Sequence, residues 1–245
     1  MSGPDPRPPL PRLEFVDWLR REGERRYHDR HPYHVLMHDG KLTRRQLQQW
    51  VLNRYYYQTR IPIKDALILS KSSDPAFRRM WIRRIRDHDG DEADEGGLAL
   101  WLRLAEGVEL DVEEVASCRS VLPGVRFACD GYVELVRERS LVEAVASSLT
   151  EFFAPDLMSQ RVVAWERHYP WVRSDVLEYF RSRVPRARRD SQEAMDFVVR
   201  HATTYALQER CVAALIRKTE ILWHLLDCLY VAEVQPIATP PEAGG

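Results

Sequence analysis

Three histidines recur at intervals of three residues in the stretch RRYHDRHPYH. His28, His31 and His34 carry the side chain that most often binds transition metals and moves protons near neutral pH. Pro32 predicts the end of the preceding helix, so His31 and His34 would not share a helical face and would instead shape a turn. Di-iron helical proteins also use Glu-x-x-His pairs, which the sequence lacks. The stretch therefore favours a proton-carrying role for His28 over a metal site.

A second polar stretch, DHDGDEADEGG, has the composition of a calcium-binding loop but not its register. With Asp87 in the first position, Glu92 stands where such a loop needs glycine, and Leu98 stands where it needs glutamate. We therefore expect a helix that ends at His88, a turn at Gly90, and acidic residues that solvate the start of the next helix. His88 differs from these acids because it falls on the inward face of its helix, where it can carry protons.

Cationic side chains continue the apolar faces of several predicted helices. Leu47, Trp50 and Val51 define one such face, and the next positions on it are Arg54 and Gln58. The same i, i+3, i+4 spacing puts further cations on the inward faces of other helices. With their polar neighbours, these are Arg84 with His88, Arg161, Arg183 with Tyr179, and Lys218.

Such buried cations need either internal acids or an anionic ligand, because an unpaired buried charge is strongly destabilising. Asp65 and Glu151 are the acids best placed to pair with them, and they are too few. We therefore predict a hydrated, positively charged cavity inside a helical bundle. A small molecule with several carboxylates suits this cavity, because arginine holds a carboxylate through two hydrogen bonds. The side chains expected to orient such a ligand are Tyr27, Gln58, Tyr132 and Tyr179.

The elements that carry these residues are predicted to be helical, with almost no strand-like alternation. Thr43 and Gln46 form a capping-box pattern, and Asp74-Pro75 is typical of a helix start. Pro62 is expected to kink or restart the chain. Helices are predicted from Phe15 to Arg26, from Thr43 onward, from Pro75 to about 88, and over 94–106, 110–117, 123–138, 140–150, 154–168, 174–183, 186–202 and 204–231.

Length and composition narrow the class of protein. The 245 residues, 44% of them hydrophobic, suffice for one compact all-α domain, predicted over 12–234, with disordered tails at 1–11 and 235–245. A net charge of −1 gives no basic excess for nucleic acid, and no apolar run reaches the length of a membrane helix. The four cysteines lack zinc spacing, and the N-terminus lacks the apolar core of a signal peptide. We therefore expect a soluble, cytoplasmic protein.

Several long motifs resemble one protein family. They are YHDRHPYHVLMHDGKL, WVLNRYYYQTRIPIKDA, RRMWIRRIRDHDG, VLPGVRFACDGYV, SSLTEFFAP, HYPWV, YFRSRV and KTEILWHLLD, and they cover nearly all of residues 12–232 in order. On these motifs the chain resembles the pyrroloquinoline-quinone synthase (PqqC) family. The resemblance implies a heme-oxygenase-like, TenA-like bundle of seven helices plus short ones around an internal cavity. It also implies a homodimer.

The resemblance further implies an activity. The family performs the final step of pyrroloquinoline quinone (PQQ) biosynthesis, in which the bicyclic precursor AHQQ undergoes ring closure and eight-electron oxidation to PQQ. Dioxygen is the co-substrate, H2O2 is released, and neither a metal nor an organic redox cofactor takes part. Oxygen must then react directly with a deprotonated substrate, so the protein would remove protons, stabilise charge and exclude water. Precursor and product are polycarboxylates, which agrees with the cationic cavity.

The active-site positions of the family carry over by motif. The arginines and the lysine would hold carboxylates and quinone oxygens, and the two histidines would move protons. The resemblance assigns catalytic roles to His28, His88, Glu151, Tyr179 and Arg183. It assigns substrate binding to Tyr27, Arg54, Gln58, Arg84, Tyr132, Thr150, Arg161 and Lys218.

One position departs from the family pattern. Met158, in APDLMSQR, stands where many members carry a histidine that is assigned to the oxygen-reactive part of the site. Methionine neither donates nor accepts a proton, so the step that this histidine serves must use water or another residue here. We therefore expect slower turnover or an altered route, with the substrate pocket intact.

Two other kinds of function remain open on the same fold. A thiaminase-like hydrolase needs an inward nucleophilic cysteine, for which Cys129 is the only candidate, and a metal-dependent oxidase needs a bound metal. A non-catalytic carrier would bind PQQ tightly without turnover. The length of the matching motifs favours the synthase.

Overall fold

Helices make up nearly all of residues 7–235, the part of the chain that the computed structural model describes. No strand occurs in this range, so the predicted all-α class is confirmed. Three of the eleven α-helices, α2, α6 and α8, have seven residues or fewer, and the longer ones form the body of the bundle. The α-helices are α1 (Arg12–Arg26), α2 (Pro32–His38), α3 (Arg44–Ser70), α4 (Pro75–Asp89), α5 (Gly96–Gly107), α6 (Val112–Ser117), α7 (Pro123–Glu138), α8 (Leu141–Ser147), α9 (Ala154–His168), α10 (Glu178–His201) and α11 (Tyr205–Glu233), and the 3-10 helices are η1 (His28–Arg30), η2 (Ser148–Phe153) and η3 (Ser174–Leu177).

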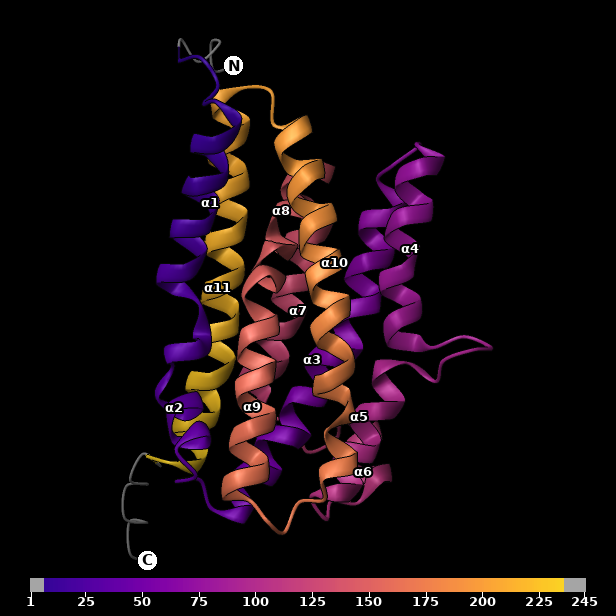
Figure 1. The fold of residues 1–245 in the computed structure, drawn as a ribbon, viewed down its shortest axis with the longest axis vertical. Coiled ribbons are helices and arrows are strands. Elements are labelled where there is room, and N and C mark those ends of the chain that lie inside the picture. Colours follow the sequence, from indigo (N-terminus) through magenta and orange to yellow (C-terminus); the bar gives the residue numbers. More distant parts are fainter. Residues whose placement is uncertain (1–6, 236–245) are drawn as a thin grey trace, which may run out of the picture.

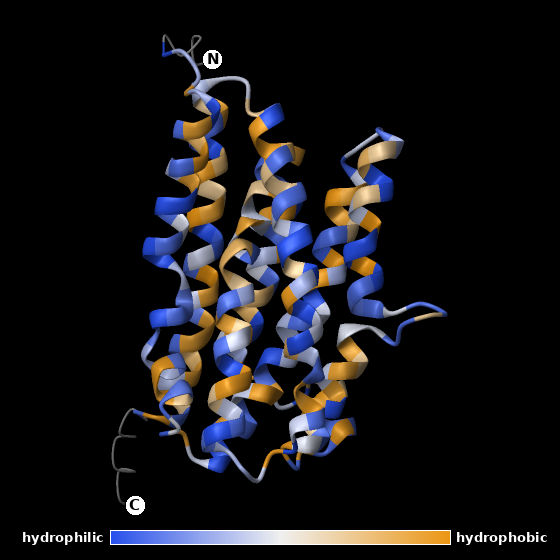
Figure 2. Ribbon diagram, in the orientation of Figure 1, coloured by the Kyte–Doolittle hydropathy of each residue, from blue (hydrophilic) through white to orange (hydrophobic). Residues whose placement is uncertain are grey.

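Most of the long helices run side by side along the long axis of the molecule (Figure 1). α1 packs along α11, α10 packs along α9, and α3 packs against α4 and α7. α4 lies at one edge, where its connection to α5 projects from the bundle (Figure 1). Hydrophilic and hydrophobic residues alternate along the helices in Figure 2, as expected for helices that bury one face.

Aromatic rings join four helices at the centre of the core. Trp50 of α3 lies 5.5 Å from Trp101 of α5 and 5.9 Å from Trp165 of α9, measured between ring centroids. Trp165 in turn lies 5.5 Å from Phe180 of α10. All four side chains are buried, and large buried aromatic surfaces contribute strongly to stability. This cluster fixes the relative positions of α3, α9 and α10.

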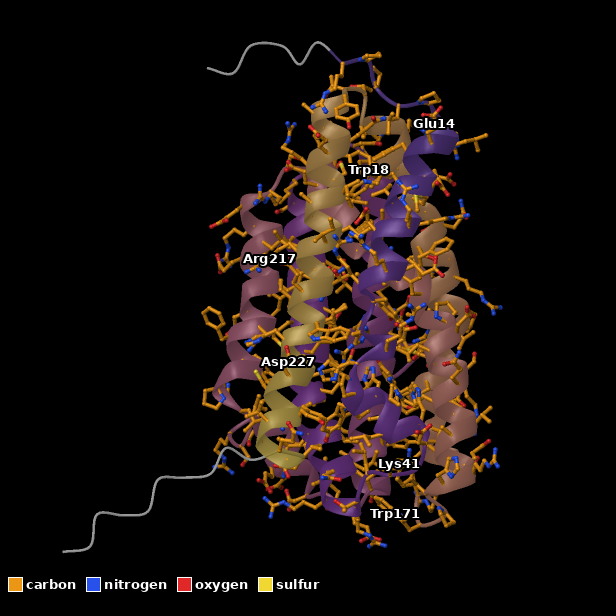
Figure 3. The ribbon with its side chains drawn as sticks, turned by 90° about the vertical axis from the view of Figure 1, so that its left-hand side faces the viewer. Glu14, Trp18, Lys41, Trp171, Arg217 and Asp227 are labelled. Carbon is orange, nitrogen blue, oxygen red and sulfur yellow. The ribbon has the colours of Figure 1, made fainter. Side chains whose placement is uncertain are left out.

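A second set of contacts fastens α1 and the residues before it to α11. Trp18 stacks on Tyr205 with ring centroids 6.1 Å apart, and both helices face the viewer in Figure 3. The backbone N–H of Leu10 donates to Gln208 Oε1 over 2.8 Å. The predicted tails lie largely on residues 1–6 and 236–245, outside the described residues.

The predicted helix starts at Thr43 and Asp74 are confirmed. Thr43 and Gln46 form a capping box at the start of α3. Asp74 accepts a hydrogen bond from the N–H of Ala76 over 2.8 Å, and Pro75 occupies the first turn of α4. α4 ends at Asp89, and Gly90 follows with a φ of +87°, a conformation that favours glycine. This turn sets the position of His88.

The chain does not restart at Pro62, and the prediction of two separate helices over 174–183 and 186–202 is wrong. α3 continues through Pro62, and residues 178–201 form the single helix α10 with Pro185 inside it. A proline without an N–H costs one helical hydrogen bond, but the buried residues on both sides keep these helices continuous. At Pro62 the carbonyl that loses its helical donor belongs to Gln58.

The expected role of Pro32 is also wrong. α1 ends at Arg26, and Pro32 occupies the first turn of a new helix, α2. The missing N–H of proline is harmless there, because the first helical N–H groups have no partner within the helix. His34 consequently lies on a helix and not in a turn.

No helix within residues 7–235 is long and apolar enough to span a membrane.

Candidate active site

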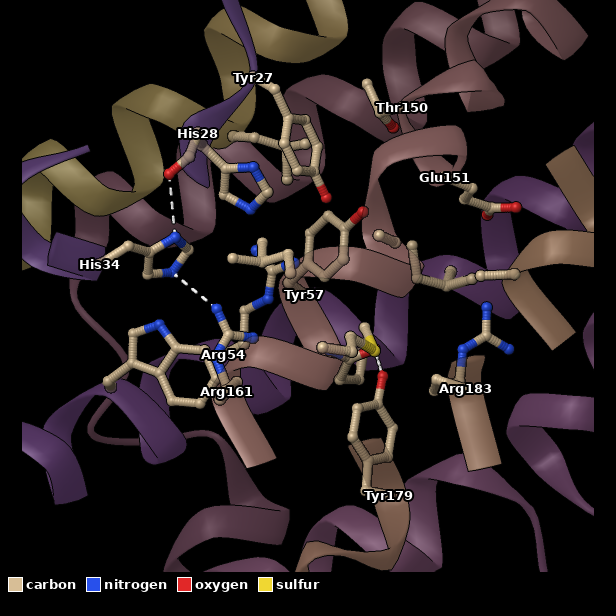
Figure 4. Close-up of a pocket in the computed structure, with 18 of the residues that line it drawn as sticks. Tyr27, His28, His34, Arg54, Tyr57, Thr150, Glu151, Arg161, Tyr179 and Arg183 are labelled. Carbon is tan, nitrogen blue, oxygen red and sulfur yellow. Dashed lines mark hydrogen bonds between the residues drawn. The ribbon is translucent and has the colours of Figure 1, made fainter. Parts of the chain in front are cut away.

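A narrow cavity of about 60 Å³ lies inside the bundle, smaller than the roughly 300–1,000 Å³ that is usual for small-molecule sites, so a ligand of ordinary size must displace side chains of its walls. Its walls come from Tyr27, which follows α1, and from η1, α2–α4, η2 and α9–α11 (Figure 4). Most residues that the sequence assigned to the site line this cavity, namely Tyr27, His28, Arg54, Gln58, His88, Thr150, Glu151, Arg161, Tyr179 and Arg183. The others, Arg84, Tyr132 and Lys218, lie behind the wall.

The lining carries more cationic donors than the protein itself can satisfy. Arg54 Nη1, Arg161 Nε and Arg183 Nη1 are buried nitrogens without a hydrogen-bond partner among the described residues. Glu151 is the only carboxylate among the described residues that line the cavity. Burial, together with the charge of nearby Arg54, lowers the pKa of Arg161 to about 9, so Arg161 remains charged at neutral pH. The cavity therefore has the electrostatics of an anion-binding site.

Glu151 is already engaged by a residue behind it. Arg84 Nη1 donates to Glu151 Oε2 over 2.7 Å, and Arg84 Nη2 donates to the carbonyl of Asp190 over 2.5 Å. Burial alone would raise the pKa of Glu151, but the charges of Arg84 and Lys64 outweigh it and lower that pKa. Glu151 is therefore ionised, and Arg84 supports it from behind.

Asp65 pairs with a cation other than those singled out from the sequence. Lys64 Nζ donates to Asp65 Oδ1 over 2.7 Å, and both side chains are fully buried. Trp81 Nε1 donates to the same oxygen over 3.0 Å, and Lys64 also donates to Ser148 Oγ over 3.1 Å. Asp65 is thus committed to this network, which leaves the cavity arginines without it.

Lys218 lies behind the cavity wall, between two tyrosines. Its Nζ is 3.4 Å from the ring centroid of Tyr132 and 4.3 Å from that of Tyr57, a residue of the wall. The amine is buried and has no hydrogen-bond partner among residues 7–235. Burial and the charge of Arg54 hold the pKa of Lys218 well below its usual value, which favours the neutral amine.

His28 and His88 are neutral bases inside the cavity. His88 Nδ1 donates to the carbonyl of Arg84 over 3.0 Å, so in the neutral ring Nε2 carries the lone pair. His28 Nδ1 is buried without a partner among the described residues. Burial lowers the pKa of both rings well below 6.5, and the positive charge of Arg54 for His28 and of Arg183 for His88 lowers it further. Both rings can accept a proton that a ligand releases.

Two tyrosines retain their protons and act as donors. The hydroxyl of Tyr179 donates to Gln58 Oε1 over 2.8 Å, which links α10 to α3. Burial raises the pKa of Tyr179 and of Tyr27. Tyr27 can therefore donate to a ligand oxygen without ionising at neutral pH, whereas Tyr179 can do so only if its hydrogen bond to Gln58 breaks.

Sequence reasoning missed His34, Trp50 and Tyr57, which also line the cavity. The prediction that Pro32 ends a helix also places His34 in a turn. A proline in the first turn of a helix was the alternative signal, and it would have placed His34 and His38 on one face. Figure 4 shows His34 beside Arg161 on the cavity wall. The sequence places Trp50 on the apolar face of its helix, and it gives no separate signal for Tyr57.

Met158 and Cys129 differ in their relation to the cavity. Met158 of α9 lines it, as the motif position predicts. Cys129 is buried in α7 and does not line it, and burial raises the pKa of its thiol to about 12. Because a thiol must ionise to attack, this position does not support a cysteine hydrolase. Among residues 7–235, no group of three or more His, Cys, Asp or Glu side chains is placed to hold a metal ion.

Known proteins agree with this fold and with the matching motifs. A relative from Xanthomonas euvesicatoria pv. vesicatoria (strain 85-10), named pyrroloquinoline-quinone synthase, is 51% identical over 225 residues, which are 92% of this chain and 90% of the relative. A domain of unknown function with a heme oxygenase-like fold from Shewanella denitrificans has a TM-score of 0.74 at 12% identity and covers 94% of this chain and 99% of its own. A TenA homolog from Pseudomonas syringae pv. tomato has a TM-score of 0.66 at 15% identity and covers 91% of this chain and 98% of its own. The sequence model of the TENA/THI-4/PQQC family matches residues 18–228, and the chain therefore belongs to this family.

Proposed function

We propose that the chain is a pyrroloquinoline-quinone synthase. It would close the last ring of AHQQ and oxidise the product to PQQ, with O2 as co-substrate and release of H2O2. The relative of that name is 51% identical across 92% of the chain, which supports the same activity here. The proposal includes a homodimer in the cytoplasm, and sedimentation of the purified protein tests the dimer.

The observation that carries the proposal is the set of unpaired cationic donors on one cavity. Arg54, Arg161 and Arg183 each present a buried nitrogen without a partner among the described residues, and one engaged carboxylate shares the wall with them. Unsatisfied buried donors are costly, and a ligand with several carboxylates would satisfy them. AHQQ and PQQ are such ligands.

The same walls suit oxidation without a metal or an organic cofactor, which is also part of the proposal. His28 and His88 would take protons from the precursor, because both rings are held neutral with an acceptor nitrogen. Loss of these protons makes the substrate electron-rich, so that it reduces O2 directly. The arginines would stabilise the anionic charge that develops, and the closed walls would exclude water.

The test is conversion of AHQQ by protein that has been stripped of metals. In air we expect PQQ, identified by its absorption spectrum and by chromatography, together with H2O2. The matched control is the same mixture without O2, in which AHQQ should persist. Conversion only after a metal is added back would refute the cofactorless route, and absence of PQQ under every condition would refute the synthase.

A further inference from the structure

His34 is buried between two partners that both use its imidazole ring. Its exposed fraction is 1%. Nδ1 lies 2.9 Å from the carbonyl oxygen of His28, and Nε2 lies 3.3 Å from Nη2 of Arg161 (Figure 4). The two contacts tie the turn that carries His28 to the helix that carries Arg161.

These two partners fix the protonation state of the ring. A carbonyl oxygen only accepts hydrogen bonds, so Nδ1 must carry the proton. A guanidinium only donates, so Nε2 must carry the lone pair. Only the neutral Nδ1-H tautomer satisfies both contacts, and burial, reinforced by Arg161, lowers the pKa of His34 well below 6.5 in agreement. His34 is therefore an acceptor aimed at Arg161.

Arg161 depends on this acceptor for its orientation. The contact with His34 is the only hydrogen bond that its guanidinium makes within residues 7–235, and no described carboxylate forms an ion pair with it. The guanidinium lies over the ring of Trp50, 4.7 Å from the centroid, and the charge of Arg54 acts against it. Its Nε is buried and has no hydrogen-bond partner among the described residues.

We propose that His34 is a positioning residue that holds the Arg161 guanidinium in place to bind a carboxylate of the substrate. This inference rests on the proposed function for the identity of the ligand. His34 itself would not touch the ligand's reacting atoms. A neutral acceptor serves here where an acid would not, because a carboxylate would neutralise Arg161 and compete with the ligand.

The test compares two substitutions that each keep one half of the imidazole. The side-chain amide of Gln in His34→Gln reaches the place of Nε2 and keeps an acceptor for Arg161. Asn in His34→Asn reaches only the place of Nδ1 and keeps the donor to the His28 carbonyl. We expect His34→Asn to weaken PQQ binding and to raise KM for AHQQ by about tenfold or more, with a smaller change in kcat. His34→Gln should restore both to within about threefold of wild type.

A double mutant separates positioning from an independent role. If His34 acts through Arg161, His34→Asn should add little to Arg161→Met, because the effects of coupled residues do not add. His31→Asn is the matched control, because His31 is equally buried but caps α2, hydrogen-bonds Asp227 and does not line the cavity. It should bind PQQ like wild type.

The outcomes distinguish the inference from the proposed function. If wild type binds no PQQ, the proposed function fails. If wild type binds PQQ, and His34→Asn binds it equally well or its effect adds in full to that of Arg161→Met, the positioning role is wrong. Circular dichroism and Tm show whether each variant is folded. If His34→Asn does not fold, His34→Gln provides the test. Folded His34→Gln protein that has lost PQQ binding would equally overturn the inference.

Discussion

Two kinds of side chain characterise the cavity, namely arginines with a buried nitrogen that has no hydrogen-bond partner among the described residues, and histidines that stay neutral. The apolar stripes revealed Arg54, Arg161 and Arg183 from the sequence, because a cation that continues an apolar face must be buried. The apolar stripes did not show whether the charged end of each side chain reaches the cavity. Arg84 and Lys218 share the inward faces but end behind Glu151 and Tyr57, and only the packing of the neighbouring helices decides this.

Replacing Lys218 is predicted to preserve or raise the stability of the protein while it weakens ligand binding. Its amine is buried without a hydrogen-bond partner among the described residues, so removing it should not destabilise the unliganded protein. We expect Lys218→Met to be as stable as wild type or more stable by up to about 3 kcal/mol. The pKa of Lys218 is lowered in the folded protein, so below about pH 10 the unfolded chain binds a proton at this amine that the folded chain does not. This proton uptake favours unfolding of wild type, and the stability advantage of the variant should therefore shrink toward pH 10. Urea unfolding at pH 7 and pH 10 measures this.

The functional half of this prediction concerns ligand affinity. If the ligand displaces Tyr57 and reaches the amine, Lys218→Met should bind PQQ more weakly although it is no less stable. A variant that is clearly less stable than wild type would show that Lys218 is satisfied in a way that the contacts with Tyr57 and Tyr132 do not account for.

Met158 gives a prediction about rate. It lines the cavity, and its thioether cannot exchange protons. Met158→His places an acid-base group on the wall and should accelerate O2 consumption, by up to about 10²-fold if proton transfer limits that step. An oxygen electrode and PQQ absorbance follow the reaction, and Met158→Leu is the control for packing. Equal rates in all three proteins would mean that proton transfer at this position does not limit turnover.

At the scale of elements, the helix ends decide where the site residues stand. The starts at Thr43 and Asp74 could be predicted because capping is local chemistry within four residues. The neighbouring sequence could not predict whether the prolines at positions 32, 62 and 185 begin, interrupt or continue a helix. Proline is tolerated in a first turn, and it is tolerated inside a helix when burial on both sides outweighs the lost hydrogen bond. That balance depends on distant residues.

Two glycines test the importance of the turn after α4. A Cβ at Gly90 would lie 2.6 Å from the carbonyl oxygen of Glu95, and the φ of +87° disfavours other residues. Gly90→Ala should therefore cost roughly 1–3 kcal/mol and lower kcat, because His88 lies in the last turn of the helix that Gly90 follows. Gly131→Ala is the matched control, since nothing lies within 4 Å of its added Cβ in α7. It should stabilise by about 0.8–1 kcal/mol. Thermal unfolding compares them, and similar effects would contradict this role of the turn.

For the whole molecule, the class of fold followed from helical periodicity and the absence of strand-like alternation. The inward cations then predicted a polar interior. Periodicity could not predict that α2, α3, α4, α9 and α10 converge on one cavity, because this depends on how the central tryptophans pack the helices together.

Buried neutral histidines predict that the whole molecule loses stability in mild acid. His28, His34 and His88 titrate near 6.5 when unfolded and far lower when folded. Below pH 6.5 the unfolded chain therefore binds protons that the folded chain does not. The free energy of unfolding is thus highest above pH 6.5 and decreases as the pH falls. The slope approaches about 1.4 kcal/mol per pH unit for each histidine. Urea unfolding between pH 7.5 and 5.0 measures it, and His34→Gln should reduce the slope by one histidine. A flat profile would contradict the burial of these rings as neutral bases.

The central claim is that the cavity oxidises AHQQ and does not merely store PQQ. The most direct measurement is a single turnover, with protein in excess over AHQQ in aerated buffer and the full absorption spectrum recorded over time. The account predicts that the AHQQ spectrum converts completely to that of protein-bound PQQ, at a rate that falls when O2 is withdrawn. A persistent AHQQ spectrum, in protein that still binds added PQQ tightly, would contradict the account and identify a carrier.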